Sequence, residues 1–272
     1  MSDSRALGFF DSGLGGLTVL RAVHAKFPEE NLVYLGDTAR LPYGTKSPET
    51  IRRYADQCVE NLISRNVKAV VVACNSASTV LLGDASKKYP VPVYNVIEPG
   101  AEAALASSTS KRIGVLGTRA TVNSNAYPNA IQALDPKAIV YQNAAPLLVP
   151  LVEEGWELDP LTNLIIYRYV APLMSQSIDT LILGCTHYPV LRAGIERVTG
   201  SGISLVDSAE LIVRNLERDF ASGKLSKRVS PKNEPENGKI ELFATDASHA
   251  MDVTARRLLQ QPSAGPFMAC DL

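Results

Sequence analysis

The 272-residue chain has almost no net charge, few cysteines and no long apolar segment. Each of these features excludes some classes of function. It carries 27 Lys and Arg against 28 Asp and Glu, so it has no strongly basic character of the kind that binds nucleic acid or an anionic membrane. No apolar run approaches the ~20 residues that span a bilayer, and the N-terminus lacks the apolar core of a secretory signal. We therefore expect a cytoplasmic protein whose partner is a small molecule, with no nucleic acid and no membrane.

Short apolar segments alternate with helical patterns, which is typical of βαβ units and a mostly parallel sheet. Polar residues followed by proline at Ser47-Pro48 and Asp159-Pro160 predict the starts of two helices. The polar segment 222–238 predicts a surface loop. Strands are expected at residues 6–10, 31–35, 69–73, 91–96, 112–116, 138–142, 180–184, 204–206 and 240–244.

Two distant segments share one pattern. Residues 67–78 (VKAVVVACNSAS) and 178–189 (IDTLILGCTHYP) both run from a polar start through an apolar strand to a cysteine and then hydroxyl or amide groups. The similarity fits two diverged copies of one half-sheet, and it equally fits ordinary βα sequence. If the repeat is real, the predicted fold class is α/β, with two lobes related by a pseudo-twofold axis and a mostly parallel, helix-flanked sheet in each. The first lobe would be residues 1–97, completed by 209–272, and the second 98–208, with the active site in the cleft between them.

The four cysteines are expected to be thiols, because a cytoplasmic compartment is reducing. Cys58 falls in an amphipathic helix and Cys270 in the C-terminal tail, so neither is assigned a chemical role. Cys74 and Cys185 follow strands and precede polar loops, where nearby helix N-termini would favour the thiolate.

Several chemistries compete for Cys74 and Cys185. The spacing of two cysteines and His187 does not match a structural zinc site, and the thiols are too far apart in sequence for a CxxC-like redox pair. Cys185 and His187 could form a nucleophile–base pair, but that leaves Cys74 without a task. One thiol on each side of a bound carbon fits two lobes best, because one could remove a proton while the other delivers one to the opposite face.

Glycine-rich and turn segments predict a site for a small anion. The segment 13–16 (GLGG) follows a strand and begins a helix, so its N–H groups can face an anion, although it breaks the GxGxxG spacing of dinucleotide sites. Pro42-Tyr43-Gly44 is a turn whose amides could hold a carboxylate, or simply a turn. Asp207-Ser208 is expected to cap a helix, and for Thr121 capping and ligand contact are equally expected.

Four motifs closely resemble glutamate racemases of the aspartate/glutamate racemase superfamily. They cover residues 10–17 (FDSGLGGL), 36–44 (GDTARLPYG), 73–78 (ACNSAS) and 184–189 (GCTHYP), and residues 150–155 (PLVEEG) match as well. The resemblance implies an amino-acid isomerase that interconverts L- and D-glutamate without a cofactor or metal and supplies D-glutamate for peptidoglycan. It departs at Ser76, where the family usually has threonine.

The resemblance also implies the roles of individual residues. Cys74 matches the base that acts on D-glutamate and Cys185 the base that acts on L-glutamate. Asp11 matches the acid beside the first thiol, and Glu153 and His187 match the groups beside the second. The expected substrate-binding residues are Asp11, Ser12, Tyr43, Gly44, Asn75, Ser76, Thr118, Thr121, Thr186 and His187.

Other functions remain compatible with the sequence. A racemase or isomerase of another small dicarboxylate, such as aspartate or maleate, would use the same cysteine pair. A two-lobed solute-binding module would explain a cleft but not the two cysteines. The sequence does not fix the oligomeric state, and a homodimer is one compatible assembly.

Overall fold

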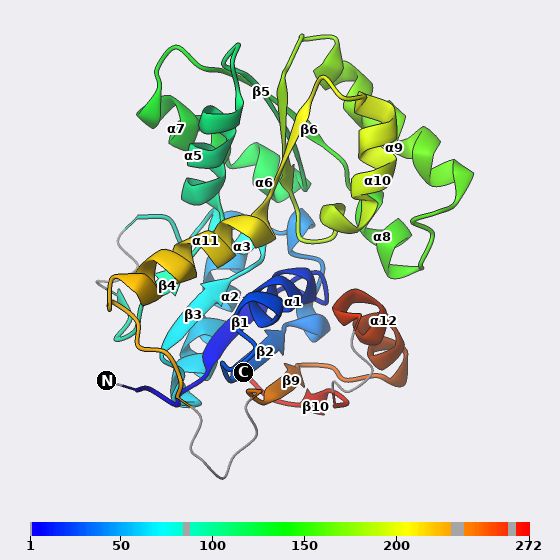
Figure 1. Ribbon diagram of the computed structural model, residues 1–272. Coiled ribbons are helices and arrows are strands. Elements are labelled where there is room, and N and C mark those ends of the chain that lie inside the picture. The colour runs from blue at the N-terminus through cyan, green and yellow to red at the C-terminus, as the bar shows by residue number, and fades with distance from the viewer. Residues whose placement is uncertain (1, 84–87, 230–236, 261–264) are drawn as a thin grey trace.

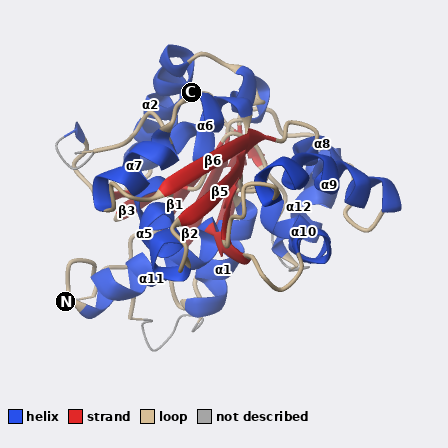
Figure 2. Cartoon of the chain, turned by 90° about the horizontal axis from the view of Figure 1, so that it is seen from above, coloured by secondary structure: helices blue, strands red, loops and turns tan. Residues whose placement is uncertain are grey.

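Two parallel β-sheets, each flanked by helices, form two lobes in the computed structural model (Figure 1). The structure describes residues 2–83, 88–229, 237–260 and 265–272. Residues 230–236 of the expected surface loop lie outside the described residues. Figure 2 shows the strands at the centre of the molecule with helices around them. The fold is therefore α/β with two lobes, as predicted.

The first lobe is built on a six-stranded sheet with the order β10-β9-β2-β1-β3-β4, in which every pairing is parallel. Its apolar strands are covered on both faces, so β1, β2 and β3 are buried along their whole length. Its strands are β1 (Leu7–Asp11), β2 (Leu32–Gly36), β3 (Ala69–Val72), β4 (Val93–Tyr94), β9 (Ile240–Ala244) and β10 (Met268–Ala269).

The second lobe is built on a four-stranded parallel sheet with the order β6-β5-β7-β8. This order corresponds to β2-β1-β3-β4 of the first lobe, so the two lobes repeat one topology and β7 is the counterpart of β3. The repeat suggested by the sequence is thus present in the fold. Its strands are β5 (Arg112–Gly117), β6 (Ile139–Ala144), β7 (Thr180–Gly184) and β8 (Ser204–Asp207).

Polar caps and prolines fix where the longest helices begin. The Ser47 hydroxyl accepts a hydrogen bond from the Thr50 N–H at 3.3 Å, and the Asp159 carboxylate accepts one from the Leu161 N–H at 2.7 Å. Both predicted helix starts are confirmed. The helices are α1 (Leu17–Lys26), α2 (Pro48–Ser64), α3 (Asn75–Ser78), α5 (Ile97–Ser107), α6 (Arg119–Asn123), α7 (Ala126–Leu134), α8 (Leu148–Glu153), α9 (Pro160–Met174), α10 (Arg192–Thr199), α11 (Ser208–Ala221) and α12 (His249–Leu259).

Among the described residues, short 3-10 turns also occur at Thr38–Arg40, Tyr43–Thr45 and Tyr188–Leu191. All nine expected strands are present, with small differences at their ends. The expected strand 91–96 shrinks to Val93–Tyr94, because Pro92 has no N–H to donate to its neighbour. The two-residue strand β10 was not predicted, since so short a segment has no recognisable pattern.

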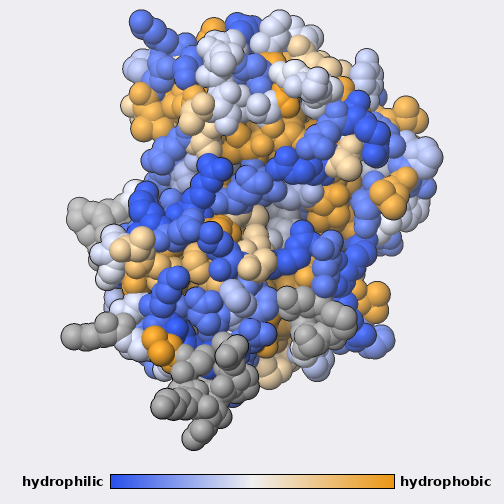
Figure 3. Space-filling view, in the orientation of Figure 1, coloured by the Kyte–Doolittle hydropathy of each residue, from blue (hydrophilic) through white to orange (hydrophobic). Residues whose placement is uncertain are grey.

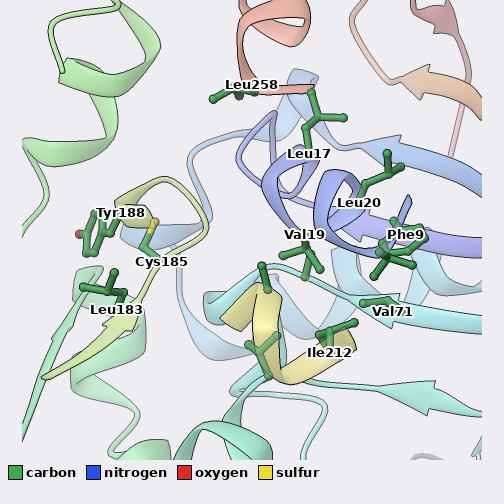
Figure 4. Close-up of a cluster of buried hydrophobic side chains, with 14 of the residues drawn as sticks. Phe9, Leu17, Val19, Leu20, Val71, Leu183, Cys185, Tyr188, Ile212 and Leu258 are labelled. Carbon is green, nitrogen blue, oxygen red and sulfur yellow. The ribbon is translucent and has the colours of Figure 1, made fainter. Parts of the chain in front are cut away.

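A shared hydrophobic core joins the lobes. One buried cluster contains Phe9 and Leu17 of the first lobe together with Leu183 and Tyr188 of the second. Figure 4 shows Leu183 and Tyr188 on one side and Phe9 and Leu17 on the other, with Cys185 beside Tyr188. On the outside, Figure 3 shows mainly hydrophilic residues with hydrophobic ones in patches between them. The core holds the two lobes against each other and leaves a cavity at the ends of their strands.

Candidate active site

Cys74 and Cys185 line one cavity of about 270 Å³, although they are 111 positions apart in the sequence. Cys74 directly follows β3 and Cys185 directly follows β7, its counterpart in the other lobe. Both are buried, with 5% and 6% of the residue exposed. All four cysteines are free thiols. Two parallel sheets thus bring their carboxyl ends, and one thiol each, to a common site.

The Cys74 sulfur lies in a polar but water-poor environment. Its thiol donates to the Ser12 hydroxyl at 3.5 Å, and its sulfur accepts from the Ala77 N–H at 3.5 Å, so Cys74 caps the short helix α3. Burial and the charge of Asp11 raise the pKa of Cys74 to about 12. The expectation that a helix N-terminus would favour the thiolate is wrong for Cys74, because burial and a neighbouring carboxylate outweigh it.

Asp11 stands behind the Cys74 side of the cavity and is 1% exposed. Its carboxylate accepts hydrogen bonds from the Gly13 N–H at 3.0 Å and from the Thr186 hydroxyl of the other lobe at 3.3 Å. Burial raises the pKa of Asp11, while the charge of His187 opposes that rise. Asp11 therefore contributes negative charge and hydrogen bonding from behind, without lining the cavity itself.

The Cys185 sulfur lies against a histidine that is paired with a carboxylate. His187 Nδ1 is 3.8 Å from Cys185 Sγ, and His187 Nε2 is 3.1 Å from Glu153 Oε1. Burial alone would lower the pKa of His187, but hydrogen bonds to Cys185 and Glu153 outweigh it and raise the pKa to about 10. This raised pKa predicts an imidazolium at neutral pH, with its positive charge next to the sulfur.

Eight of the ten expected binding residues line the cavity. Asp11 and Thr121 are the exceptions, and both are fully or almost fully buried behind the wall. The Thr121 hydroxyl is 3.1 Å from that of Thr118, whose oxygen also caps α6 by accepting from the Thr121 N–H. The residues that line the cavity as expected are Ser12, Tyr43, Gly44, Asn75, Ser76, Thr118, Thr186 and His187.

Several polar side chains at the cavity join one lobe to the other. The Ser76 and Thr118 hydroxyls are 2.8 Å apart, and the Asn75 amide oxygen accepts from the Tyr127 hydroxyl at 2.7 Å. The Asn75 amide nitrogen donates to the Ser208 hydroxyl at 3.4 Å. Both ends of the Asn75 amide are therefore held by residues of the second lobe.

The turn after β2 is held from the side by a buried acid. The Tyr43 hydroxyl donates to the Asp37 carboxylate, which also accepts from Arg40 Nε and from the Thr245 hydroxyl at 3.0 Å. The Tyr43 hydroxyl is thus directed to Asp37, while Tyr43 and Gly44 both line the cavity. Asp207 accepts from the Ala209 N–H at 2.8 Å, which confirms its predicted capping role.

Some residues of the cavity wall were not predicted from the sequence. Arg119 is the only Lys or Arg among them, and its position directly after the strand-end residue Thr118 was the available signal. Apolar wall residues gave no signal, because the same residue types fill every core. The other unpredicted residues are Leu41, Thr45, Pro146, Val149 and Pro150, whereas Gly13 and Pro42 belong to the glycine and turn segments already expected at an anion site.

Within the described residues, no cluster of three or more His, Cys, Asp or Glu side chains could hold a metal ion. In that same part of the chain, no helix has the length and apolar character needed to cross a membrane.

Comparisons with known proteins agree on one family. The model of the family described as Asp/Glu/Hydantoin racemase matches residues 17–216. A glutamate racemase of Sulfurihydrogenibium is 46% identical over 247 residues, which cover 90% of each chain. Among solved structures, a glutamate racemase isoform from Bacillus anthracis has a TM-score of 0.90, 34% identity and 98% coverage of both chains. The Francisella tularensis glutamate racemase in complex with D-glutamate has a TM-score of 0.88, 31% identity and the same coverage. With this fold, this pair of thiols and these relatives, the chain belongs to the Asp/Glu/Hydantoin racemase family of amino-acid isomerases.

Proposed function

We propose that this protein is a glutamate racemase in which Cys74 and Cys185 act as the two acid–base groups. The observation that carries the proposal is a single cavity bordered by one thiol from each of two equivalent strand ends. Relatives named glutamate racemase, similar over nearly the whole chain, support glutamate as the substrate.

The proposed reaction moves one proton off the α-carbon and another onto its opposite face. With L-glutamate, the Cys185 thiolate takes the α-proton, and the electron pair left on the carbon is shared with the α-carboxylate. The Cys74 thiol then donates its proton to the other face and gives D-glutamate. In the reverse direction Cys74 is the base and Cys185 the acid, so no cofactor is needed.

The environment of each thiol supports this division. A Cys74 pKa of about 12 keeps that sulfur protonated in the free enzyme and ready to act as the acid. His187, held by Glu153, lies 3.8 Å from the Cys185 sulfur and would place its positive charge beside that thiol. The negative charge of Asp11 would oppose early loss of the proton from the Cys74 thiol.

Hydroxyl and amide groups would bind the substrate and stabilise the carbanion-like transition state. The α-proton of an amino acid is very weakly acidic, so preorganised donors near the α-carboxylate are essential, and each is worth roughly 3–4 kcal/mol. We propose that Arg119 is a partner for one substrate carboxylate. We assign the remaining contacts to Ser12, Tyr43, Gly44, Asn75, Ser76, Thr118 and Thr186, with Thr121 supporting from behind.

The product suggests the biological role. D-glutamate made in the cytoplasm would be available for peptidoglycan synthesis, and a reducing compartment would keep both catalytic thiols from oxidation.

Incubation with L-glutamate in D2O tests the proposal. We expect optical rotation to decay to zero while deuterium enters the α-position of the D-glutamate formed, with L-aspartate reacting far more slowly. Faster reaction of aspartate would assign the protein to another dicarboxylate. Ligand binding without deuterium uptake would indicate a binding module and contradict the proposal.

A further inference from the structure

The C-terminal helix α12 belongs to the first lobe but also contacts the second. It follows β9 of the six-stranded sheet and is fixed to α1 by a hydrogen bond from Arg21 Nη1 to the Leu258 carbonyl at 3.0 Å. Leu258 is 2% exposed, and Figure 4 shows it beside Leu17 of α1. Figure 1 shows the other side of α12 directly below α8. The helix is thus placed to connect the lobes.

Arg257 makes that connection through the end of α8. Its Nη2 donates to the carbonyls of Val152 and Glu153 at 2.5 and 3.1 Å. Its Nη1 donates to the Glu157 carboxylate at 2.8 and 3.1 Å. The last carbonyls of a helix have no donor within that helix, and a cation at this end also compensates the helix dipole. Arg257 therefore fixes the point at which α8 ends.

The residue at this end of α8 is Glu153, which contacts the active site. Its carboxylate is 3.1 Å from His187 Nε2, and the other nitrogen of that ring is 3.8 Å from the Cys185 sulfur. The Glu153 side chain is 35% exposed, so packing constrains it only in part. The position of its carboxylate consequently depends on how firmly its backbone is held, and Arg257 bonds to that backbone.

The chain beside this contact leaves room for the guanidinium. Gly155 has a φ of +77°, the left-handed conformation that commonly follows a helix end, and its N–H donates to the Val152 carbonyl at 3.1 Å. A Cβ at this position would lie 2.7 Å from Arg257 Nη1. The glycine thus permits both the backbone turn and the close approach of Arg257.

We propose that Arg257 is a positioning residue that acts from the opposite lobe. By binding the last carbonyls of α8, it holds Glu153 against His187 and so maintains the geometry of the Cys185 side of the site. This inference rests on the proposed racemase function. The Cys185 side of the active site then depends on α12, which follows the central strands of both sheets in the sequence.

The substitution Arg257→Gln tests the contact, and Arg256→Gln is its matched control. Arg256 is the neighbouring residue on α12, is exposed, and would lose the same charge. We expect Arg257→Gln to lower kcat for glutamate racemisation about tenfold with little change in KM, because misplacement near the reacting groups affects catalysis more than binding. Arg256→Gln should stay within about twofold of the unmodified protein, and Arg257→Lys, which lacks the fork of donors, should be intermediate.

A double-mutant cycle with Glu153→Gln separates positioning from a general structural effect. If Arg257 acts through the Glu153 carboxylate, Arg257→Gln should lower kcat less than about twofold in the Glu153→Gln background. The same tenfold loss in both backgrounds, or no difference between Arg257→Gln and Arg256→Gln, would overturn the inference.

A second variant guards against loss of folding. Glu157→Gln weakens the hold on the guanidinium but leaves Arg257 in place, and we expect a smaller fall in kcat that also vanishes in the Glu153→Gln background. An unchanged kcat in both Arg257→Gln and Glu157→Gln would contradict the inference even if the Arg257 variant were unstable. If the unmodified protein does not racemise glutamate, the proposed function is wrong. That outcome is distinct from a failure of the Arg257 inference, which is judged by comparing variants.

Discussion

Cys74 and Cys185 occupy matching positions in their lobes but have opposite electrostatic surroundings. Cys74 faces the buried Asp11, whereas Cys185 faces the imidazolium of His187. The sequence suggested both partners, since His187 lies two residues after Cys185 and the FDSG motif resembles that of the racemases. It could not reveal the high pKa of Cys74, because that value depends on burial by segments distant in the chain.

His187 should keep its proton well above the pH at which a free histidine loses it. Its pKa of about 10, against an ordinary value of 6.5, means that the folded protein keeps the imidazolium between these pH values while the unfolded chain loses it. His187 should therefore stabilise the fold fully below pH 6.5, and this contribution should fall as the pH rises towards 10. Racemisation should also decline above about pH 10, when Cys185 loses its cationic neighbour.

Proton NMR of the histidine rings can measure this directly, because the chain has only three histidines. His187→Gln would identify the resonance by removing it. A midpoint below pH 7 for His187 would contradict the assigned network.

The elements around the site were largely predictable because polar caps, prolines and apolar runs act locally. The GLGG segment before α1 shows where that predictability ends. Its glycines were expected to present N–H groups to an anion, and Gly13 lines the cavity. Gly15 packs against the loop after β7 of the other lobe. The Gly15 α-carbon lies so close to this loop that a side chain would not fit. This contact forms only when the two lobes are assembled, so the local sequence could not reveal it.

Substitution of Gly15 by alanine should therefore disrupt catalysis. The new Cβ would lie 2.2 Å from the Thr186 hydroxyl oxygen and 2.4 Å from His187 Nδ1, so both groups must move. Since a displacement of ~1 Å can cost about 100-fold in rate, we expect the racemisation rate to fall by about that factor. Gly202→Ala, at a position with open space around it, is the control and should have no effect. Retention of more than half the activity by Gly15→Ala would show that the contact is not tight.

At the scale of the whole molecule, contacts between segments far apart in sequence hold the lobes and termini together. Hydrogen bonds between Ser76 and Thr118, and from Thr18 to the Thr186 carbonyl, cross between lobes at the cavity. The repeated topology could be suspected from the sequence, because two cysteine segments share a pattern. The hydrogen bonds between the lobes could not be predicted, because each depends on how the two lobes are oriented relative to each other.

A buried ion pair at the base of the first lobe gives a prediction for stability. Lys68 and Glu30 both have fully buried side chains, and Lys68 Nζ is 2.5 Å from Glu30 Oε2 and 2.9 Å from the Ser226 carbonyl. Lys68→Met would leave the carboxylate buried without its cation, and should lower the free energy of unfolding by about 3–5 kcal/mol. Urea denaturation measures this change.

Two controls sharpen that measurement. Lys68→Met combined with Glu30→Gln should be less destabilising than Lys68→Met alone, because the uncompensated charge is gone. Lys88→Met breaks a more exposed pair with Asp56 and should cost less than about 1 kcal/mol. Equal losses from Lys68→Met and Lys88→Met would mean that burial does not govern the first pair.

The division of labour between the two thiols is the central claim, and racemisation rates alone cannot test it. The two enantiomers have equal free energy, so kcat/KM must be the same in both directions for every variant. Exchange of the α-proton with D2O without racemisation distinguishes the thiols, because each can still exchange the enantiomer whose proton it faces.

The most direct measurement follows this exchange by proton NMR in Cys74→Ala and Cys185→Ala, with each enantiomer supplied separately. Both variants should lose at least about 100-fold in racemisation, since each lacks one acid–base group. Cys74→Ala should exchange the α-proton of L-glutamate and leave D-glutamate unlabelled, while Cys185→Ala should do the reverse. A single variant that racemises at nearly the normal rate, or that exchanges both enantiomers alike, would contradict the two-thiol account.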